Sequence, residues 1–250
     1  MSGHSKWHSI KHKKGAADAK RGKIFTRHAN LITMAARSGG GDPEMNPTLR
    51  LMIDNAKKDN VPNENITRAV KRGTGELKDG AEIHEIIYEG YGPGKVAVII
   101  ECLTDNKNRT LTNVRTVVNK RGGNLGASGS VAWMFERKGV ITISVKGKDP
   151  DELELIAIDA GATDIERSDD EMEIYTVASD LNEVSEKLRS AGITIENAEV
   201  SMVPNQTVKI EDEATAQKVI DFIDAIEEDE DVSNVFANFD ISDELMEKIS

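Results

Sequence analysis

Apolar residues recur at helical spacing through the first third of the chain. Over residues 18–37 the apolar positions fall on one face of a helix that a run of glycines then ends: Ile24, Leu31, Ile32 and Ala35. A second helix is expected from Pro47, because proline suits the first helical turn. A third is expected over 62–73. The pattern therefore predicts a small helical domain at the N-terminus.

The middle third changes to the pattern of strands. Apolar runs at 83–88 and 96–102 predict two strands joined by a glycine-rich turn. A helix is expected to follow from Asp105, a residue type that suits the N-cap position, and to end at the glycines 122–123. A further strand is expected at 131–135. Strands and a helix in this order indicate an α/β domain.

Residues 139–203 predict strands and helices in the order β-α-β-β-α-β, which is the order of a ferredoxin-like unit. A helix around 219–226 and a strand at 232–239 follow, and they are too few to form a domain of their own. We expect these last elements to complete the sheet that begins at 83–102.

The predicted fold class is α+β, with three domains. They are a basic helical domain at 1–80, a discontinuous α/β domain at 81–137 plus 205–250, and an acidic ferredoxin-like domain at 138–204 inserted into the second. A length of 250 residues fits this division, since one core usually serves about 100–150 residues.

Composition narrows the class of protein. The single cysteine, Cys102, excludes an internal disulfide and favours a reducing compartment. No apolar run approaches the ~20 residues of a membrane span. The basic N-terminus has no apolar stretch behind it, so it does not have the pattern of a secretory signal. We expect a cytoplasmic protein without a membrane partner.

Charge is divided sharply along the chain. The net charge is +9 over residues 1–73, +2 over 74–150 and −23 over 151–250, which gives −12 for the whole chain. Solubility alone explains an excess of acids but does not explain why they are segregated. A molecule with one basic and one acidic pole can turn its basic end toward a polyanion while its acidic end is repelled.

The basic pole is concentrated at the N-terminus. The first 28 residues hold eight Lys/Arg and one acid, together with Trp7 and four of the five histidines. Cations neutralise phosphates and release counterions, and an aromatic ring can stack on an exposed base. The residues predicted to bind nucleic acid are Lys6, Trp7, His8, Lys11, His12, Lys13, Lys14, Lys20, Arg21, Lys23 and Arg27.

Other interpretations of this N-terminal segment remain open. Trp7 can equally be a local packing anchor, and the charge run can be a solvated helix face. His4, His8 and His12 recur every four residues, as metal ligands on a helix can. Five flanking lysines oppose a divalent ion, and no cysteine or carboxylate lies nearby, so we expect no metal and no cofactor.

Two glycine-rich stretches invite comparison with phosphate-binding loops. The stretch 90–95 lacks the spacing of such a loop and joins two strands, so a tight turn is expected. The stretch 122–129 follows two cations, and its N–H groups can either cradle a phosphate or form a long turn. Secondary phosphate contacts are predicted at Lys107, Arg109, Lys120 and Arg121.

No catalytic constellation stands out in the sequence. It has no nucleophile elbow, zinc signature, kinase set or dinucleotide fingerprint. Cys102 falls in a predicted buried strand. The acid run 227–231 lacks the spacing of a calcium loop and is interpreted as a solvated connection. We therefore predict a protein that is not an enzyme; a hydrolase with a hidden site is an alternative of another class.

Several strings closely resemble those of the YebC/PmpR family, and the resemblance extends over essentially the full length. They are Gly3–Trp7, Lys11–Lys14, Asp18–Phe25, Gly39–Pro43, Tyr88–Gly94, Thr104–Thr110, Gly122–Gly126 and Gly129–Val131. The resemblance implies a helical N-terminal domain and two α/β domains, the last inserted in the second. Members are commonly described as transcriptional regulators that bind DNA. Mitochondrial relatives are translational activators of cytochrome oxidase subunit synthesis, and bacterial relatives are linked to the ribosome and stalled proline-rich synthesis.

The predicted function is a non-enzymatic, nucleic-acid-binding regulator of gene expression that resembles the probable DNA-binding transcriptional regulators of this family. The alternative is a ribosome-associated translation factor whose basic N-terminus contacts ribosomal or transfer RNA. An adaptor whose acidic domain binds a basic protein is a third hypothesis. The sequence leaves the choice of DNA or RNA and the oligomeric state open.

Overall fold

The computed structural model describes residues 18–77, 82–168 and 170–249. Three helices come first, α2 (Asp18–Gly39), α3 (Pro47–Lys58) and α4 (Asn63–Gly73), close to the ranges predicted. Asn46 joins α2 to α3: its side-chain oxygen accepts the Leu49 N–H at 3.0 Å, and its amide donates to Ala35 O at 2.9 Å. The three helices enclose a core around Ile32, Leu49 and Ile66.

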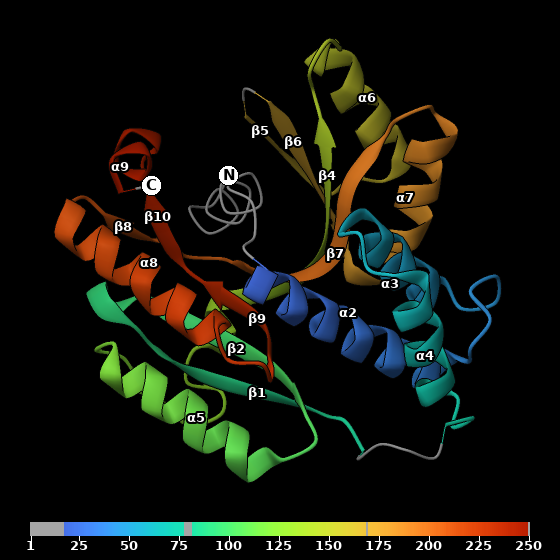
Figure 1. Ribbon diagram of the computed structural model, residues 1–250. Helices are drawn as coiled ribbons and strands as arrows, with labels where there is room; N and C mark the ends of the chain where they lie inside the picture. The colour runs from blue at the N-terminus through green and yellow to red at the C-terminus, as the bar shows by residue number, and fades with distance from the viewer. Residues whose placement is uncertain (1–17, 78–81, 169, 250) are drawn as a thin grey trace.

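The first sheet has the order β3 (Asn124–Leu125), β1 (His84–Tyr91), β2 (Ala97–Thr104) and β9 (Val232–Ala237), with antiparallel neighbours throughout. Helices α5 (Lys107–Lys120) and α8 (Glu213–Glu227) cover one of its faces, as Figure 1 shows. β2 pairs with β9 although residues 105–231 separate them. The last elements therefore complete the sheet that earlier ones begin, as the apolar pattern predicts.

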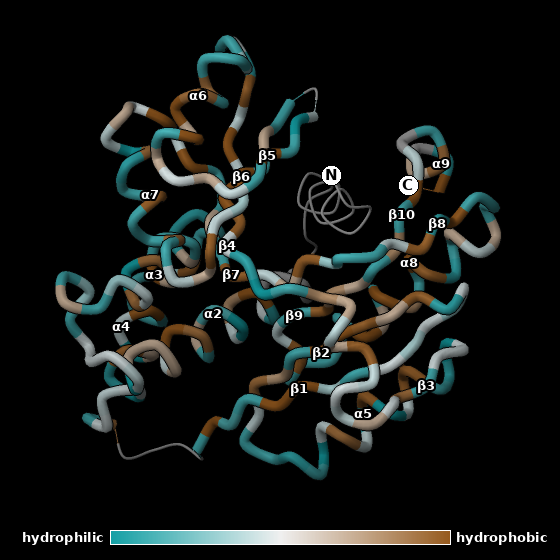
Figure 2. Tube along the Cα trace, turned by 180° about the vertical axis from the view of Figure 1, so that it is seen from behind, coloured by the Kyte–Doolittle hydropathy of each residue, from teal (hydrophilic) through white to brown (hydrophobic). Residues whose placement is uncertain are grey.

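The second sheet has the order β5 (Asp164–Arg167), β6 (Glu171–Val177), β4 (Phe135–Ser144) and β7 (Ile195–Pro204). Helices α6 (Pro150–Ala160) and α7 (Leu181–Ser190) pack on one face. The chain order β4-α6-β5-β6-α7-β7 with this strand order is the ferredoxin-like arrangement. The predicted α+β class with an inserted ferredoxin-like unit is confirmed. Figure 2 shows the hydrophobic segments gathered in the strands and helices of these units.

Two local predictions are wrong. Asn106, not Asp105, caps α5, because its side-chain oxygen accepts the Arg109 N–H at 3.1 Å. The segment expected as a strand at 131–135 is a 3₁₀ turn, η2 (Ala132–Met134), and β4 begins only at Phe135. The reason is that the N–H groups of Val131 and Ala132 donate to a carboxylate and not to a neighbouring strand.

The shortest elements were not predicted at all. β8 (Val208–Ile210) and β10 (Phe239–Ile241) form a parallel pair, and α9 (Asp243–Ile249) follows. Two further 3₁₀ turns, η1 (Pro93–Lys95) and η3 (Ala178–Asp180), precede β2 and α7. Elements of three residues are too short to show a hydrophobic period, so pattern alone cannot find them.

Candidate nucleic-acid interface

The structure brings only part of the predicted N-terminal interface into view. Lys20 and Arg21 lie in the first turn of α2, and of this set only Lys23 and Arg27 have described side chains. The other predicted contacts lie outside the described residues: Lys6, Trp7, His8, Lys11, His12, Lys13 and Lys14. Figure 1 shows the first turns of α2 between the two sheets.

Arg27 of α2 faces the first sheet. Arg27 Nη2 donates to Asn234 Oδ1 of β9, and Asn234 Nδ2 donates to Glu101 Oε2 of β2 at 2.8 Å. Burial raises the pKa of Glu101, and Glu85 and Glu199 add to this effect. Arg27 is thus part of a contact inside the molecule, where it ties α2 to β9. Its role in binding nucleic acid stays a prediction.

The second half of α2 is fixed on the helical domain. His28, only 6% exposed, lies with its Nε2 2.6 Å from Asp59 Oδ2. Thr33, which is fully buried, donates its hydroxyl to Ala29 O at 2.7 Å and lies 3.1 Å from Ala69 O. α2 therefore connects the helical domain to the first sheet as one continuous rod.

Helix α3 packs on the ferredoxin-like unit. Asn55 Nδ2 donates to Ala198 O at 2.9 Å, and Lys58 Nζ donates to Ile195 O at 3.1 Å and Glu196 O at 2.9 Å. These carbonyls belong to β7, an edge strand whose unpaired groups would otherwise invite another chain. The ammonium of Lys58 is committed to this contact. Partial burial lowers its pKa, and Arg189 adds to that.

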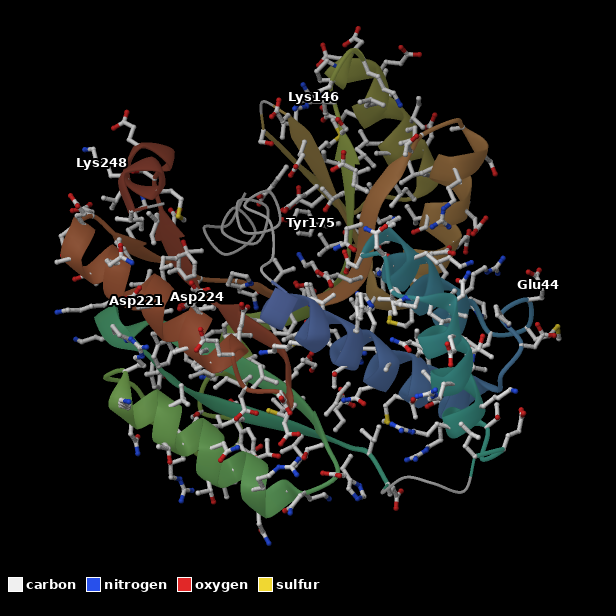
Figure 3. The ribbon with its side chains drawn as sticks, viewed as in Figure 1. Glu44, Lys146, Tyr175, Asp221, Asp224 and Lys248 are labelled. Atoms are coloured by element: carbon white, nitrogen blue, oxygen red, sulfur yellow. The ribbon has the colours of Figure 1, made fainter. Side chains whose placement is uncertain are left out.

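Glu171 and Glu173 of the ferredoxin-like unit lie on the face of its sheet opposite α6 and α7, and both residues are buried there. On β6, Met172 and Ile174 point into the helix-covered core, so Glu173 and Tyr175 point to the opposite face. Tyr175 donates its hydroxyl to Glu173 Oε2 at 2.7 Å. Burial raises the pKa of Tyr175, and the Glu173 charge adds to it. Figure 3 labels Tyr175 on this sheet and Asp224 on α8.

Among the predicted secondary contacts, Arg109 is already occupied. Its Nη2 lies 2.9 Å from Asp231 Oδ1 and 3.0 Å from Asp105 Oδ1, and Thr110 donates its hydroxyl to Asp231 at 2.7 Å. The acid run 227–231 is therefore not merely a solvated connection, because Asp231 binds the start of α5. Arg109 serves this internal contact, and its role as a phosphate contact stays a prediction.

The glycine-rich stretch 122–129 is occupied as well. The N–H groups of Gly129, Val131 and Ala132 donate to the Glu89 carboxylate of β1 at 2.6, 2.8 and 2.8 Å. Burial alone raises the pKa of Glu89, but these three donors outweigh it and hold the pKa below its ordinary value. A carboxylate of the protein itself takes the place that a phosphate was considered for, which decides in favour of the long turn.

The other predicted secondary contacts, Lys107, Lys120 and Arg121, are exposed. Lys107 is at the start of α5, whereas Lys120 and Arg121 are at its end, so they do not form one cluster. Sequence reasoning missed Arg115 and Trp133, which are also exposed. A signal was available: residues 106–135 contain no acid.

The described part of the chain gives little support for a reactive thiol, a metal site or a membrane span. Cys102 is fully buried, and burial, with the charges of Asp229 and Asp231, raises its pKa to about 12, so the thiol stays protonated. Residues 18–77, 82–168 and 170–249 hold no group of three His, Cys, Asp or Glu side chains suited to a metal. Within the same ranges, no helix is long and apolar enough to span a membrane.

The fold and these contacts define an α+β protein in which a ferredoxin-like unit is inserted into a second α/β domain, behind a helical N-terminal domain. The chain belongs to the TACO1/YebC family. The model of the TACO1/YebC N-terminal domain matches residues 5–76, and that of the second and third domains matches residues 83–239. The resemblance seen in the sequence strings is confirmed.

Similar proteins carry a common description. A probable transcriptional regulatory protein of Halothermothrix orenii is 51% identical and the match covers 100% of this chain and 99% of the relative. One of Thermotoga maritima is 53% identical, with coverage of 100% and 98%. The crystal structure of a conserved hypothetical protein from Aquifex aeolicus has a TM-score of 0.83 at 50% identity, covering 90% of this chain and 93% of that one.

Proposed function

We propose that this protein is a nucleic-acid-binding, non-enzymatic regulator of gene expression that acts in the cytoplasm and uses its basic N-terminal segment as the main contact. The observation that carries this proposal is the charge polarity, +9 over residues 1–73 against −23 over 151–250. The names of the relatives support the regulatory class. The exposed acids on α6 and α7 of the ferredoxin-like unit support the orientation, since they repel phosphates.

Two forms of this function differ in the nucleic acid bound. A transcriptional regulator that binds DNA agrees with the description that the relatives carry. A translation factor that contacts ribosomal or transfer RNA is favoured by one observation: Trp7, His8 and His12 lie among the lysines. Such side chains bind unstacked bases, which RNA loops offer and duplex DNA does not.

The test replaces four N-terminal lysines, Lys6, Lys11, Lys13 and Lys14, with glutamine in the full chain. Affinity for a labelled nucleic acid is measured at stepped salt. Each lost phosphate contact lowers the salt slope by about 0.7 to 0.9, so we expect a slope smaller by about 3 and an affinity roughly 100-fold lower at physiological salt. A matched variant changes four lysines of the α/β domains to glutamine: Lys146, Lys148, Lys209 and Lys218. We expect it to keep the salt slope and the affinity of the wild type.

Equal losses in the two variants would mean a non-specific charge effect and would overturn the N-terminal contact. Crosslinking in cells then separates the two forms. Recovery of defined DNA sites, with preference over a scrambled duplex, supports the transcriptional regulator, whereas ribosomal or transfer RNA supports the translation factor. Activity that persists without residues 1–30 would instead favour the protein adaptor.

A further inference from the structure

Residues 106–135 form the longest acid-free stretch of a strongly acidic protein. At the average content of 44 acids in 250 residues, thirty residues would hold about five, yet this stretch holds none and carries five cations. It covers α5, the loop 121–131 and η2. The stretch is in the middle of the chain, so it is independent of the basic N-terminus in sequence.

The two ends of α5 differ in their surroundings. At its start, Asp105 and Asp231 hold Arg109, and Glu228 and Glu230 lie close by around the same hollow. At its end, Arg115, Lys120 and Arg121 are exposed, and no ion pair among the described residues involves them. The net positive charge of the helix is therefore displayed at its C-terminal half.

The outward face of α5 is polar and uncharged apart from these cations. Val114 and Val118 are buried under the helix, which leaves the opposite face to solvent. That face carries hydrogen-bonding side chains at helical spacing: Asn108, Thr112, Arg115 and Asn119. Amide, hydroxyl and guanidinium groups in such a row are the side chains that bind phosphate and sugar oxygens.

An exposed aromatic ring lies near the same edge of the sheet but on the face opposite α5, because Val131 and Phe135 on either side of it pack with Ala97 and Ile99. Trp133 is 61% exposed, and its Nε1 donates to Ser130 O at 3.1 Å, which orients the ring. The loop between α5 and Trp133 is fixed at both ends on β1: Asn124 pairs with Tyr91, and Glu89 holds the N–H groups just before Trp133. The ring is thus presented on a rigid support, and the loop 121–131 carries the chain from the end of α5 over the edge of the sheet to it.

We propose that the C-terminal half of α5 and Trp133 form a second nucleic-acid-binding surface that runs over this edge of the sheet and takes single-stranded RNA, which is flexible enough to follow it. Arg115, Lys120 and Arg121 contact its phosphates, and an unpaired base stacks on Trp133. This inference rests on the proposed function and adds to it. RNA is favoured over duplex DNA because a stacking platform needs a base that is already unstacked, and the paired bases of a duplex are not.

The first experiment measures the binding of a labelled 15-nucleotide oligo(U) to the full chain. Changing Arg115, Lys120 and Arg121 to glutamine should weaken binding roughly 10-fold and lower the salt slope by about 2. Trp133→Ala should weaken it by a similar factor, and Trp133→Phe, which keeps a ring, should weaken it less than about 3-fold. The matched control changes Lys146, Lys148 and Lys218 to glutamine and should leave the affinity unchanged.

The second experiment observes the ring directly. The chain has two tryptophans, so in a Trp7→Phe background Trp133 is the sole tryptophan reporter. Oligo(U) should quench its fluorescence, and a 15-base-pair DNA duplex should not. A thermal unfolding midpoint equal to that of the wild type shows that each variant is folded.

The outcomes separate the two proposals. Unchanged oligo(U) affinity in the triple variant, or no quenching of Trp133, overturns the second surface while the N-terminal contact stands. Equal quenching by the duplex overturns the choice of single-stranded RNA. A wild-type chain that binds neither nucleic acid overturns the proposed function itself.

Discussion

The two basic helices, α2 and α5, meet different neighbours. Arg27 of α2 is drawn into the molecule by Asn234, next to the half-buried Glu101. The end of α5 instead points its cations outward, and the carboxylate nearest to its loop, Glu89, is fully engaged by backbone donors. Both helices are basic in sequence, but a cation can attract phosphate only where the protein's own acids leave it unneutralised. Three changes test this contrast, from the largest expected effect to the smallest.

Glu89→Ala should have the largest effect, because it leaves three N–H groups without an acceptor, one of them fully buried and two partly buried. We expect the free energy of unfolding to fall by about 3 kcal/mol, measured by chemical denaturation. RNA binding at the α5 surface should weaken as well, because the support of Trp133 is lost. Glu85→Ala, an exposed acid of the same strand, is the control and should cost less than about 0.5 kcal/mol. Equal costs would contradict the anchoring role of Glu89.

Asp231→Ala should have a smaller effect, which lowers stability but strengthens RNA binding. It removes hydrogen bonds from Arg109 and Thr110, which should lower the free energy of unfolding by about 1–2 kcal/mol. It also frees Arg109, so oligo(U) should bind about 2- to 3-fold more tightly at low salt. Glu230→Ala removes the same charge from an exposed neighbour and should leave stability nearly unchanged. Weaker RNA binding by Asp231→Ala would contradict the view that the protein's own acids keep Arg109 from attracting phosphate.

The smallest effect is a pH dependence of opposite sign at two glutamates of neighbouring strands. Glu89 has a lowered pKa in the folded protein, so it stabilises above its ordinary value of 4.5 and loses this as the pH falls through its folded value. Glu101 has a raised pKa, so its charge costs stability above the folded value, and this cost disappears as the pH falls toward 4.5.

Stability of Glu89→Gln and Glu101→Gln, measured from pH 7 to pH 3, should therefore diverge. Glu101→Gln should equal or exceed the wild type at pH 7, by less than about 1 kcal/mol, and the difference should vanish near pH 4. Glu89→Gln should have a lower free energy of unfolding than the wild type at pH 7 and approach the wild-type value below pH 4.5. Parallel pH curves for the two variants would refute the assignment of these pKa shifts.

Much of the fold could be predicted because its long elements have clear periods. Helix α2, strand β2 and the β-α-β-β-α-β unit all follow from apolar spacing and capping residues. The candidate site could not be predicted to the same degree. The occupant of the glycine-rich loop is Glu89, about forty residues upstream, and the partner of Arg109 is Asp231, more than a hundred residues downstream. Such long-range contacts leave no periodic signal in the sequence.

The pairing of β2 with β9 also fixes when the first sheet can be completed during synthesis. β2 leaves the ribosome with its edge unpaired, and its partner follows only after residues 105–231 have been made. At about 5–20 residues per second that delay is on the order of ten seconds, during which the ferredoxin-like unit can fold to completion. Meanwhile the strand Ala97–Thr104, almost wholly buried in the finished protein, stays open on one side. A chain that stops before residue 232 would therefore keep an unpaired apolar strand edge, and chaperones and proteases would bind it as an incompletely folded protein.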